Sequence, residues 1–315
     1  MFQDKFAFVF PGQGSQSVGM LAQAHERFDA VRETFDDAGE ALGYDVWETV
    51  CNGPQETLNL TEVTQPVLLC ASVALWRAWL AESGPMPALM AGHSLGEWSA
   101  LVCAGALEFS DAVRLVRKRG EYMQSAVPVG EGSMAAIIGL EDAVVQRICD
   151  EVAAEQDAVL APVNFNSPGQ VVIAGHRSAV DSALEQLARA GARRAVPLQV
   201  SAPFHTELMR PAGERLAEEL ASVQLEAPRV PVVHNVHART ESDPERIRQL
   251  LVEQIYSPVQ WTGCVERITE EGVTHLVECG PGTVLSGLNR RIDRALKSFP
   301  LEDPEALLTT RSALT

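Results

Sequence analysis

The segment PALMAGHSLGEWSALVCA, residues 87–104, decides the fold of this chain. Its first part, residues 87–91, is short and apolar and follows a Gly/Pro break, which is typical of a buried strand. Its last part, residues 95–104, has the small residues of a helix, and the letters GHSLG join the two parts. A Gly-x-Ser-x-Gly turn between a strand and a helix presents a serine hydroxyl above a parallel sheet. The segment therefore predicts an α/β fold, with Ser94 as a candidate nucleophile.

The start of this predicted helix also supplies backbone N–H groups beside the serine oxygen. Such donors, together with the helix dipole, can stabilise an oxyanion. In a Gly-rich chain the five-residue pattern also arises by chance. The strand before it and the helix after it favour the nucleophile.

A serine nucleophile needs a base, and His205 is the strongest candidate among seven histidines. It follows the apolar run 195–200 and a turn that contains Pro203, so we expect it at a strand end, exposed enough to exchange protons. An unperturbed imidazole would titrate near about pH 6.5. Position alone is equally compatible with a surface histidine. Four others are structural candidates: His93, His234, His237 and His275, the last expected to pack inside a strand.

The basic run RLVRKRG, residues 114–120, offers a possible anion receptor. Most such runs are solvated faces. Leu115 and Val116 are apolar, however, and Arg119 follows Leu115 by four residues, so helical spacing turns Arg119 toward the core. An inward arginine needs an anion, and its planar fork suits a carboxylate.

Seven segments stand in one order along nearly the whole chain: FPGQGSQ (10–16), GHSLGE (92–97), RG (119–120), NFNSPGQ (164–170), SAPFH (201–205), PVQW (258–261) and GPG (280–282). Together they resemble the malonyl-CoA:acyl carrier protein transacylases of bacterial fatty acid synthesis. The set is far more specific than any one segment. The resemblance implies a hydrolase-like core, with a parallel sheet flanked by helices, and an inserted small subdomain.

The resemblance also implies the roles of single residues. Ser94 would be the acylated nucleophile, His205 its base, and Arg119 the receptor of the malonyl carboxylate. Backbone N–H groups of Gln13 and Leu95 would form the oxyanion hole.

Two further roles follow from the same resemblance. The carbonyl of Gln254 would orient the ring of His205. Phe204 stands where related methylmalonyl-specific polyketide acyltransferases carry Ser, which favours the unbranched malonyl group.

The implied reaction is ping-pong transfer of a malonyl group from malonyl-CoA to the phosphopantetheine thiol of acyl carrier protein, through a malonyl-serine. Malonyl-CoA is then a substrate, and we expect no cofactor and no metal.

The loop GQG after the apolar run 6–10 invites a dinucleotide-binding interpretation. That pattern needs a glycine at position 17, where the chain has Ser17, and no lysine follows as in a phosphate loop. Nucleotide binding at this loop is therefore not expected.

From Ser133 onward the pattern is strand (135–139), helix (142–155), strand (159–165), strand (170–174), helix (178–190), strand (194–200). That order is the ferredoxin-like β-α-β-β-α-β pattern. We therefore expect a small subdomain at residues 131–201, inserted in an acyltransferase core of residues 1–130 and 202–315. The active site is expected between the two units, because Ser94 precedes the insert and His205 follows it.

Composition limits the partners and the compartment. The chain has 315 residues, 46% of them hydrophobic, and a net charge of −17, which argues against nucleic acid. Six cysteines without Cys-x-x-Cys spacing suggest core residues in a reducing compartment. The N-terminus has no signal-peptide layout, and Arg77 interrupts the longest apolar run, so no membrane span is expected. We expect a cytoplasmic monomer.

An acidic chain meets an acidic carrier protein best at a local basic cluster. The visible clusters are Arg193-Arg194 and Arg290-Arg291, the latter with Arg294 and Lys297, and solvated faces explain each of them equally well.

Two other function classes remain open at this point. An esterase or thioesterase of the α/β-hydrolase type should carry an acid between the serine and a late histidine. A non-catalytic docking module for carrier protein would not need Ser94, His205 and Arg119 together. Whether the carrier serves fatty acid or polyketide synthesis stays open.

Overall fold

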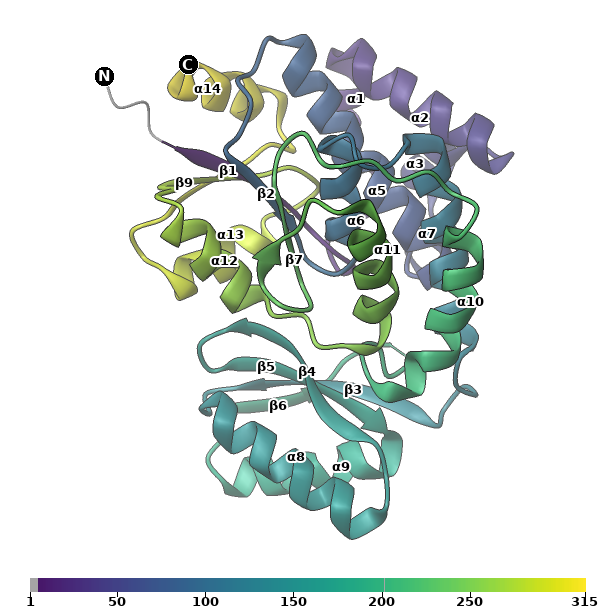
Figure 1. The fold of residues 1–315 in the computed structure, drawn as a ribbon, viewed down its shortest axis with the longest axis vertical. Coiled ribbons are helices and arrows are strands. Elements are labelled where there is room, and N and C mark those ends of the chain that lie inside the picture. Colours follow the sequence, from purple (N-terminus) through teal and green to yellow (C-terminus); the bar gives the residue numbers. More distant parts are fainter. Residues whose placement is uncertain (1–4, 201) are drawn as a thin grey trace.

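A six-stranded sheet forms the centre of the larger part of the protein (Figure 1). The computed structural model describes residues 5–200 and 202–315. The strand order is β10 (Lys297–Pro300), β9 (His275–Glu278), β1 (Phe6–Phe10), β2 (Leu89–Gly92), β7 (Val232–His234) and β8 (Arg239–Thr240). All neighbours pair in parallel except β7 and β8, which are antiparallel. The predicted parallel sheet is confirmed.

Strand β1 shows why this sheet is covered on both faces. Its five residues are all buried, and alternate side chains point to opposite faces of a strand. The three phenylalanines of β1 join one apolar cluster, whereas Ala7 and Val9 join another. The first cluster includes helices α2 (Asp29–Leu42), α5 (Thr61–Ala81), α6 (Leu95–Cys103) and α7 (Phe109–Ser125). The second includes helices α12 (Trp261–Glu270) and α13 (Val284–Ile292).

The remaining helices of this part lie around these two layers. They are α1 (Ala22–Arg27), α3 (Val46–Asn52), α4 (Gln55–Leu58), η1 (Glu207–Met209), α10 (Arg210–Leu220), α11 (Pro244–Glu253), η2 (Gln254–Tyr256) and α14 (Pro304–Leu314). The short 3-10 helix η2 directly continues α11, and the side chain of its first residue, Gln254, reaches the backbone just after β2.

Helix α5 corrects the expectation that no stretch is apolar enough to span a membrane. By length and composition this helix passes that test, since Glu62 and Arg77 are the only charged residues among its 21. In the fold, 83% of its most apolar stretch is buried. Helices α2, α6 and α7 pack against it, so α5 is the central core helix of the larger part.

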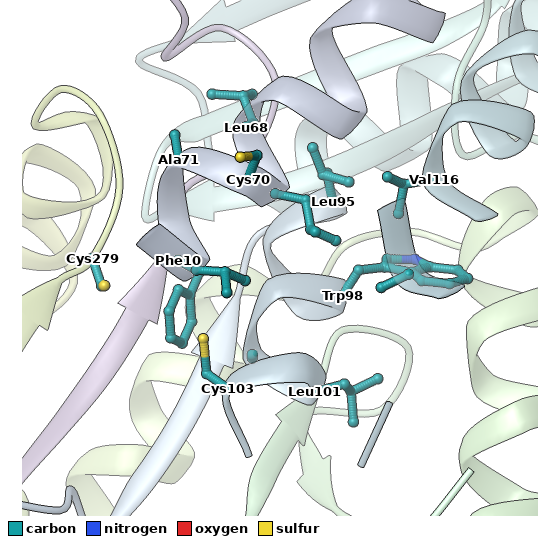
Figure 2. Packing of buried hydrophobic residues seen from close by; sticks show 14 of the residues in the cluster. Phe10, Leu68, Cys70, Ala71, Leu95, Trp98, Leu101, Cys103, Val116 and Cys279 are labelled. Carbon is teal, nitrogen blue, oxygen red and sulfur yellow. The ribbon is translucent and has the colours of Figure 1, made fainter. Parts of the chain in front are cut away.

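The cysteines are small core residues, as predicted. All six are unpaired, and five of them are buried, while Cys51 is half-buried. Figure 2 shows Cys70, Cys103 and Cys279 among the apolar side chains near Phe10.

A second sheet of four antiparallel strands lies at the other end of the molecule (Figure 1). Its elements are β3 (Gly132–Ile138), α8 (Asp142–Gln156), β4 (Leu160–Ser167), β5 (Gln170–His176), α9 (Arg177–Arg189) and β6 (Arg194–Pro197). The strand order is β4-β5-β3-β6, which is the ferredoxin-like arrangement predicted from the sequence. The last strand ends at Pro197, earlier than predicted, and Ser201 lies outside the described residues.

Backbone hydrogen bonds join the small sheet to Val259, which precedes α12 of the larger part. The Val259 amide donates to the carbonyl of Val163 at 2.8 Å, and its carbonyl accepts from the amide of Phe165 at 3.0 Å. Strand β4 is therefore tied to the segment that enters α12, close to the ends of the large-sheet strands.

Candidate active site

Ser94 lies on a sharp turn between β2 and α6, as the sequence predicts. Its backbone has φ 51° and ψ −106°, a conformation that non-glycine residues rarely adopt. Glycines on either side make this turn possible by sterics. A Cβ on Gly92 would lie 1.9 Å from the carbonyl carbon of Gly96, and one on Gly96 would lie 2.0 Å from the oxygen of Phe10. The turn therefore packs backbone directly against backbone at the end of β1.

His205 meets Ser94 although 111 residues separate them in the chain. Its Nε2 lies 2.9 Å from Ser94 Oγ, and its Nδ1 lies 2.8 Å from the carbonyl oxygen of Gln254. A carbonyl only accepts hydrogen bonds, so Nδ1 carries the ring proton and Nε2 is free to accept the serine proton. This geometry is that of a nucleophile and a general base, with the base oriented by a third group.

The environment of His205 differs from the expectation of an exposed ring. Only 4% of the residue is exposed, because its ring is enclosed between Gln254, Ser94 and Arg119. Burial, followed by the nearby Arg119 guanidinium, lowers the pKa of His205 to about 3. The imidazole is therefore neutral at physiological pH, as a base must be.

Arg119 points inward from α7, as its spacing predicts, and is 1% exposed. Its Nη1 donates to Gln65 Oε1 at 2.8 Å, while Nη2 donates to Gln254 Oε1 at 2.8 Å and to Ser94 Oγ at 3.2 Å. Burial lowers its pKa to about 10, and the charge of Glu97 partly offsets this effect. The guanidinium is therefore still a cation at neutral pH, next to the serine hydroxyl.

The backbone amides of Gln13 and Leu95 lie at the ends of neighbouring elements. Phe10 pairs with Gly92 in the parallel sheet, so the loop after β1 and the turn after β2 leave the sheet at the same edge. Leu95 is the first residue of α6, whose N-terminal amides have no partner within the helix. Within residues 5–200 and 202–315 no hydrogen bond is formed by either amide. Both N–H groups are thus available to a developing oxyanion.

Two polar residues that sequence reasoning missed stabilise this turn by buried hydrogen bonds. Asn235 follows β7; its Oδ1 accepts from the Ser94 amide at 2.7 Å, and its Nδ2 donates to the Gly92 carbonyl at 2.7 Å. Glu97 is completely buried in α6 and accepts from the Asn235 amide at 2.9 Å. The only available signal was a carboxylate within an otherwise apolar predicted helix.

The four histidines named as structural candidates have structural contacts, as expected. These contacts are His93 Nε2 with Asn166 Oδ1 at 2.8 Å, His234 Nδ1 with Glu97 Oε1 at 2.7 Å, His237 Nδ1 with the Arg239 amide at 3.1 Å, and the ring of His275 stacked on Phe299. Asn166 belongs to β4, so the contact of His93 ties the residue before the serine to the small sheet.

The structure brings together three of the four arginines named as docking candidates. Arg193, Arg194 and Arg291 line one cavity of about 530 Å³, and Arg291 donates to Gln170 there. Arg290 is exposed on the last turn of α13 and is not among the residues that line this cavity. Phe204, beside His205, is buried.

Comparisons with known proteins agree with this geometry. The family described as the acyl transferase domain matches residues 7–306. The malonyl CoA-acyl carrier protein transacylase of Salmonella typhimurium is 58% identical over 303 residues, which are 96% of this chain and 97% of that protein.

Two solved structures have nearly the same fold. The malonyl CoA-acyl carrier protein transacylase of Coxiella burnetii has a TM-score of 0.98 and 50% identity, over 99% of this chain and 98% of that one. A malonyl-transacylase solved in complex with a type II polyketide acyl-carrier protein has a TM-score of 0.96 and 52% identity, over 98% of this chain and 99% of that one.

Proposed function

Because this chain belongs to the acyl transferase family, we propose that it transfers a malonyl group from malonyl-CoA to the phosphopantetheine thiol of acyl carrier protein, through a malonyl ester of Ser94. One observation carries the proposal. A buried arginine donates to the hydroxyl of Ser94, and the same oxygen lies 2.9 Å from Nε2 of a neutral imidazole. That arrangement of groups suits an acyl group that ends in a carboxylate.

In the first half-reaction, Ser94 Oγ attacks the thioester carbonyl while its proton passes to His205 Nε2. The amides of Gln13 and Leu95 donate to the oxyanion of the tetrahedral intermediate. When the carbon–sulfur bond breaks, His205 returns the proton to the leaving sulfur, and CoA departs as a thiol. In the second half-reaction, the carrier thiol loses its proton to His205, attacks the ester, and Ser94 Oγ leaves with that proton.

The charge of Arg119 connects substrate choice with the base. Arg119 is one of the groups that lower the pKa of His205. A malonyl carboxylate paired with the guanidinium would offset that positive charge, so the pKa of His205 would rise when the correct acyl group binds. An acetyl group has no carboxylate and would leave the base weaker.

The partner of the His205 Nδ1 proton differs from the partner in hydrolase triads. In hydrolase triads this proton faces a carboxylate, which stabilises the imidazolium. Here it faces the neutral carbonyl of Gln254. The imidazolium is therefore short-lived and readily gives its proton to a leaving sulfur. We propose that no redox cofactor takes part, since exchange of an acyl group between two thiols changes no oxidation state. We also propose that no metal is needed, since the amides of Gln13 and Leu95 are available to stabilise the oxyanion.

We also propose that Phe204 restricts the acyl site to unbranched groups. We further propose that the acidic carrier protein binds at Arg193, Arg194 and Arg291, with Arg290 nearby. The Arg194→Glu variant should raise the KM for carrier protein at least fivefold and leave labelling by malonyl-CoA unchanged. Arg189→Glu, an exposed change in α9, is the control.

We further propose residues 131–201 as an inserted domain and a cytoplasmic monomer as the working form. Six unpaired thiols support a reducing compartment, and size-exclusion chromatography with light scattering tests the monomer.

Mass spectrometry after incubation with malonyl-CoA tests the central proposal. We expect one malonyl adduct on the peptide that contains Ser94, release of one CoA per enzyme, and no adduct on the Ser94→Ala variant. Turnover to free malonate without a stable adduct would instead support a thioesterase. Absence of any adduct and of any CoA release would support a docking module.

A further inference from the structure

Glu97 is a buried charge whose contacts extend in two directions. Its carboxylate is 0% exposed, and three N–H groups meet it: His234 Nδ1 at Oε1, and the Asn235 amide and Gln254 Nε2 at Oε2. A carboxylate with this many donors in the interior is fixed in position. The branch through Asn235 leads to the nucleophile turn. The branch through Gln254 leads to Arg119.

The side chain of Gln254 has only one orientation that satisfies its neighbours. Its Oε1 accepts from Arg119 Nη2 at 2.8 Å, and its Nε2 donates to Glu97 Oε2 at 2.8 Å and to the Ser94 carbonyl at 3.1 Å. If the amide flipped, NH₂ would face the guanidinium donors and oxygen would face the carboxylate. Glu97, together with the Ser94 carbonyl, therefore fixes which end of the amide faces Arg119.

We propose that Glu97 is a positioning residue for acyl-group selection, which acts through the side-chain amide of Gln254 to aim the guanidinium of Arg119. The inference rests on the proposed function of Arg119 as carboxylate receptor. Gln254 then positions two groups: its backbone carbonyl orients His205, and its side-chain amide orients Arg119.

The fork of Arg119 depends on this relay because it has few other anchors. Gln65 holds Nη1, and Gln254 and Ser94 Oγ hold Nη2. Acylation of Ser94 turns that oxygen into an ester, which is a weaker acceptor. In the acyl-enzyme, Gln254 is thus the main group that keeps Nη2 directed at the pocket. A bidentate pair with a carboxylate tolerates little misdirection of the fork.

The test compares kcat/KM for malonyl-CoA with kcat/KM for acetyl-CoA in each variant. Glu97→Ala and Gln254→Ala should each lower the malonyl-to-acetyl ratio at least tenfold. Glu97→Gln should keep the ratio within threefold of the wild type, since the new amide oxygen can accept from Asn235 and Gln254. Its NH₂ would face His234 Nδ1, and His234 can move its proton to Nε2, a buried atom without a hydrogen-bond partner in the described chain.

The double variant Glu97→Ala/Gln254→Ala adds a second criterion. Since both residues act in one chain of contacts, the ratio should fall no further than in the more severe single variant. Leu101→Ala is the control for general destabilisation, because Leu101 is buried in the same helix as Glu97 within the apolar cluster. It should lower the melting temperature and leave the ratio unchanged.

Three outcomes would overturn the proposal: a ratio within threefold of the wild type in both alanine variants, no rescue by Glu97→Gln, or independent losses that multiply in the double variant. Failure of the proposed function itself is visible separately, because the wild-type enzyme would then not prefer malonyl-CoA. If Glu97→Ala does not fold, Gln254→Ala and Glu97→Gln still decide the matter.

Discussion

Replacement of Arg119 by alanine tests the proposed selection of malonyl groups most directly. In the wild-type protein the guanidinium is 1% exposed, so a carboxylate bound to it would lose its water as well. Loss of one partner from such a buried pair costs on the order of 2–5 kcal/mol. At about 1.4 kcal/mol per tenfold, that range corresponds to a loss of roughly 30-fold to 5,000-fold in kcat/KM for malonyl-CoA.

The structure narrows this range toward its lower part. Arg119 already donates to Gln65, Gln254 and Ser94 in the free protein, so a substrate carboxylate exchanges with or adds to existing contacts. We therefore expect a loss of about 100-fold for malonyl-CoA. Acetyl transfer should be retained or increased, because removal of the Arg119 charge also raises the pKa of His205.

The measurement is the ratio of kcat/KM for malonyl-CoA to that for acetyl-CoA. Arg119→Lys should recover only part of the ratio, because the ammonium group keeps the positive charge but cannot form the bidentate pair. Arg117→Ala is the matched control on the same helix, since Arg117 is a partly exposed residue paired with Glu121. If the ratio in Arg119→Ala stays within about threefold of the wild type, which is less than 1 kcal/mol, Arg119 is not the carboxylate receptor.

Two further predictions concern the base and the nucleophile turn. Burial is the larger cause of the lowered pKa of His205, and it remains when a malonyl carboxylate offsets the charge of Arg119. The imidazole should therefore stay neutral on acidification, and the rate of Ser94 acylation by malonyl-CoA should change less than twofold between about pH 7.5 and pH 6. A rate that halves near about pH 6.5 would contradict the buried environment of His205. Gly96→Ala should lower the free energy of unfolding by about 1–3 kcal/mol in thermal or urea unfolding, because the new methyl group meets the Phe10 carbonyl. Gly287→Ala, with open space around it in α13, should be neutral or stabilising, and equal effects of the two changes would refute the steric argument.

Local signals were sufficient for the elements on which the site is built. The apolar run before Ser94 forms β2, and the small-residue run after it forms α6, within two residues of the predicted ends. Helical spacing alone placed Arg119 on the buried side of α7. These features are set by neighbours in the sequence, which is why a pattern of a few residues predicts them.

The buried polar residues could not be predicted in the same way. Glu97 and Asn235 are 138 residues apart, and each satisfies the hydrogen bonds of the other only after β7 pairs with β2. A charged residue in a helix normally indicates an exposed face, and only the tertiary partners reverse that expectation. The same reason explains the burial of His205, whose covering groups come from η2 and α7.

The oxyanion donors, the role of Phe204 and the docking arginines stay predictions. Each of these roles depends on the pose of a substrate or of a bound carrier protein. Those roles come from the resemblance. The structure of the free protein shows where these residues lie, without a bound substrate or carrier protein.

The central position of α5 has a consequence for how the chain is made. This helix is as apolar as a membrane span, and much of its cover comes from α7, which the ribosome makes later. Translation from Ala81 to Ser125 takes several seconds at roughly 5–20 residues per second. During that interval the long apolar segment of α5 is exposed to chaperones, targeting factors and other nascent chains. Fragments that end before α7 should therefore be found in aggregates or on membranes, although the finished protein hides the same helix.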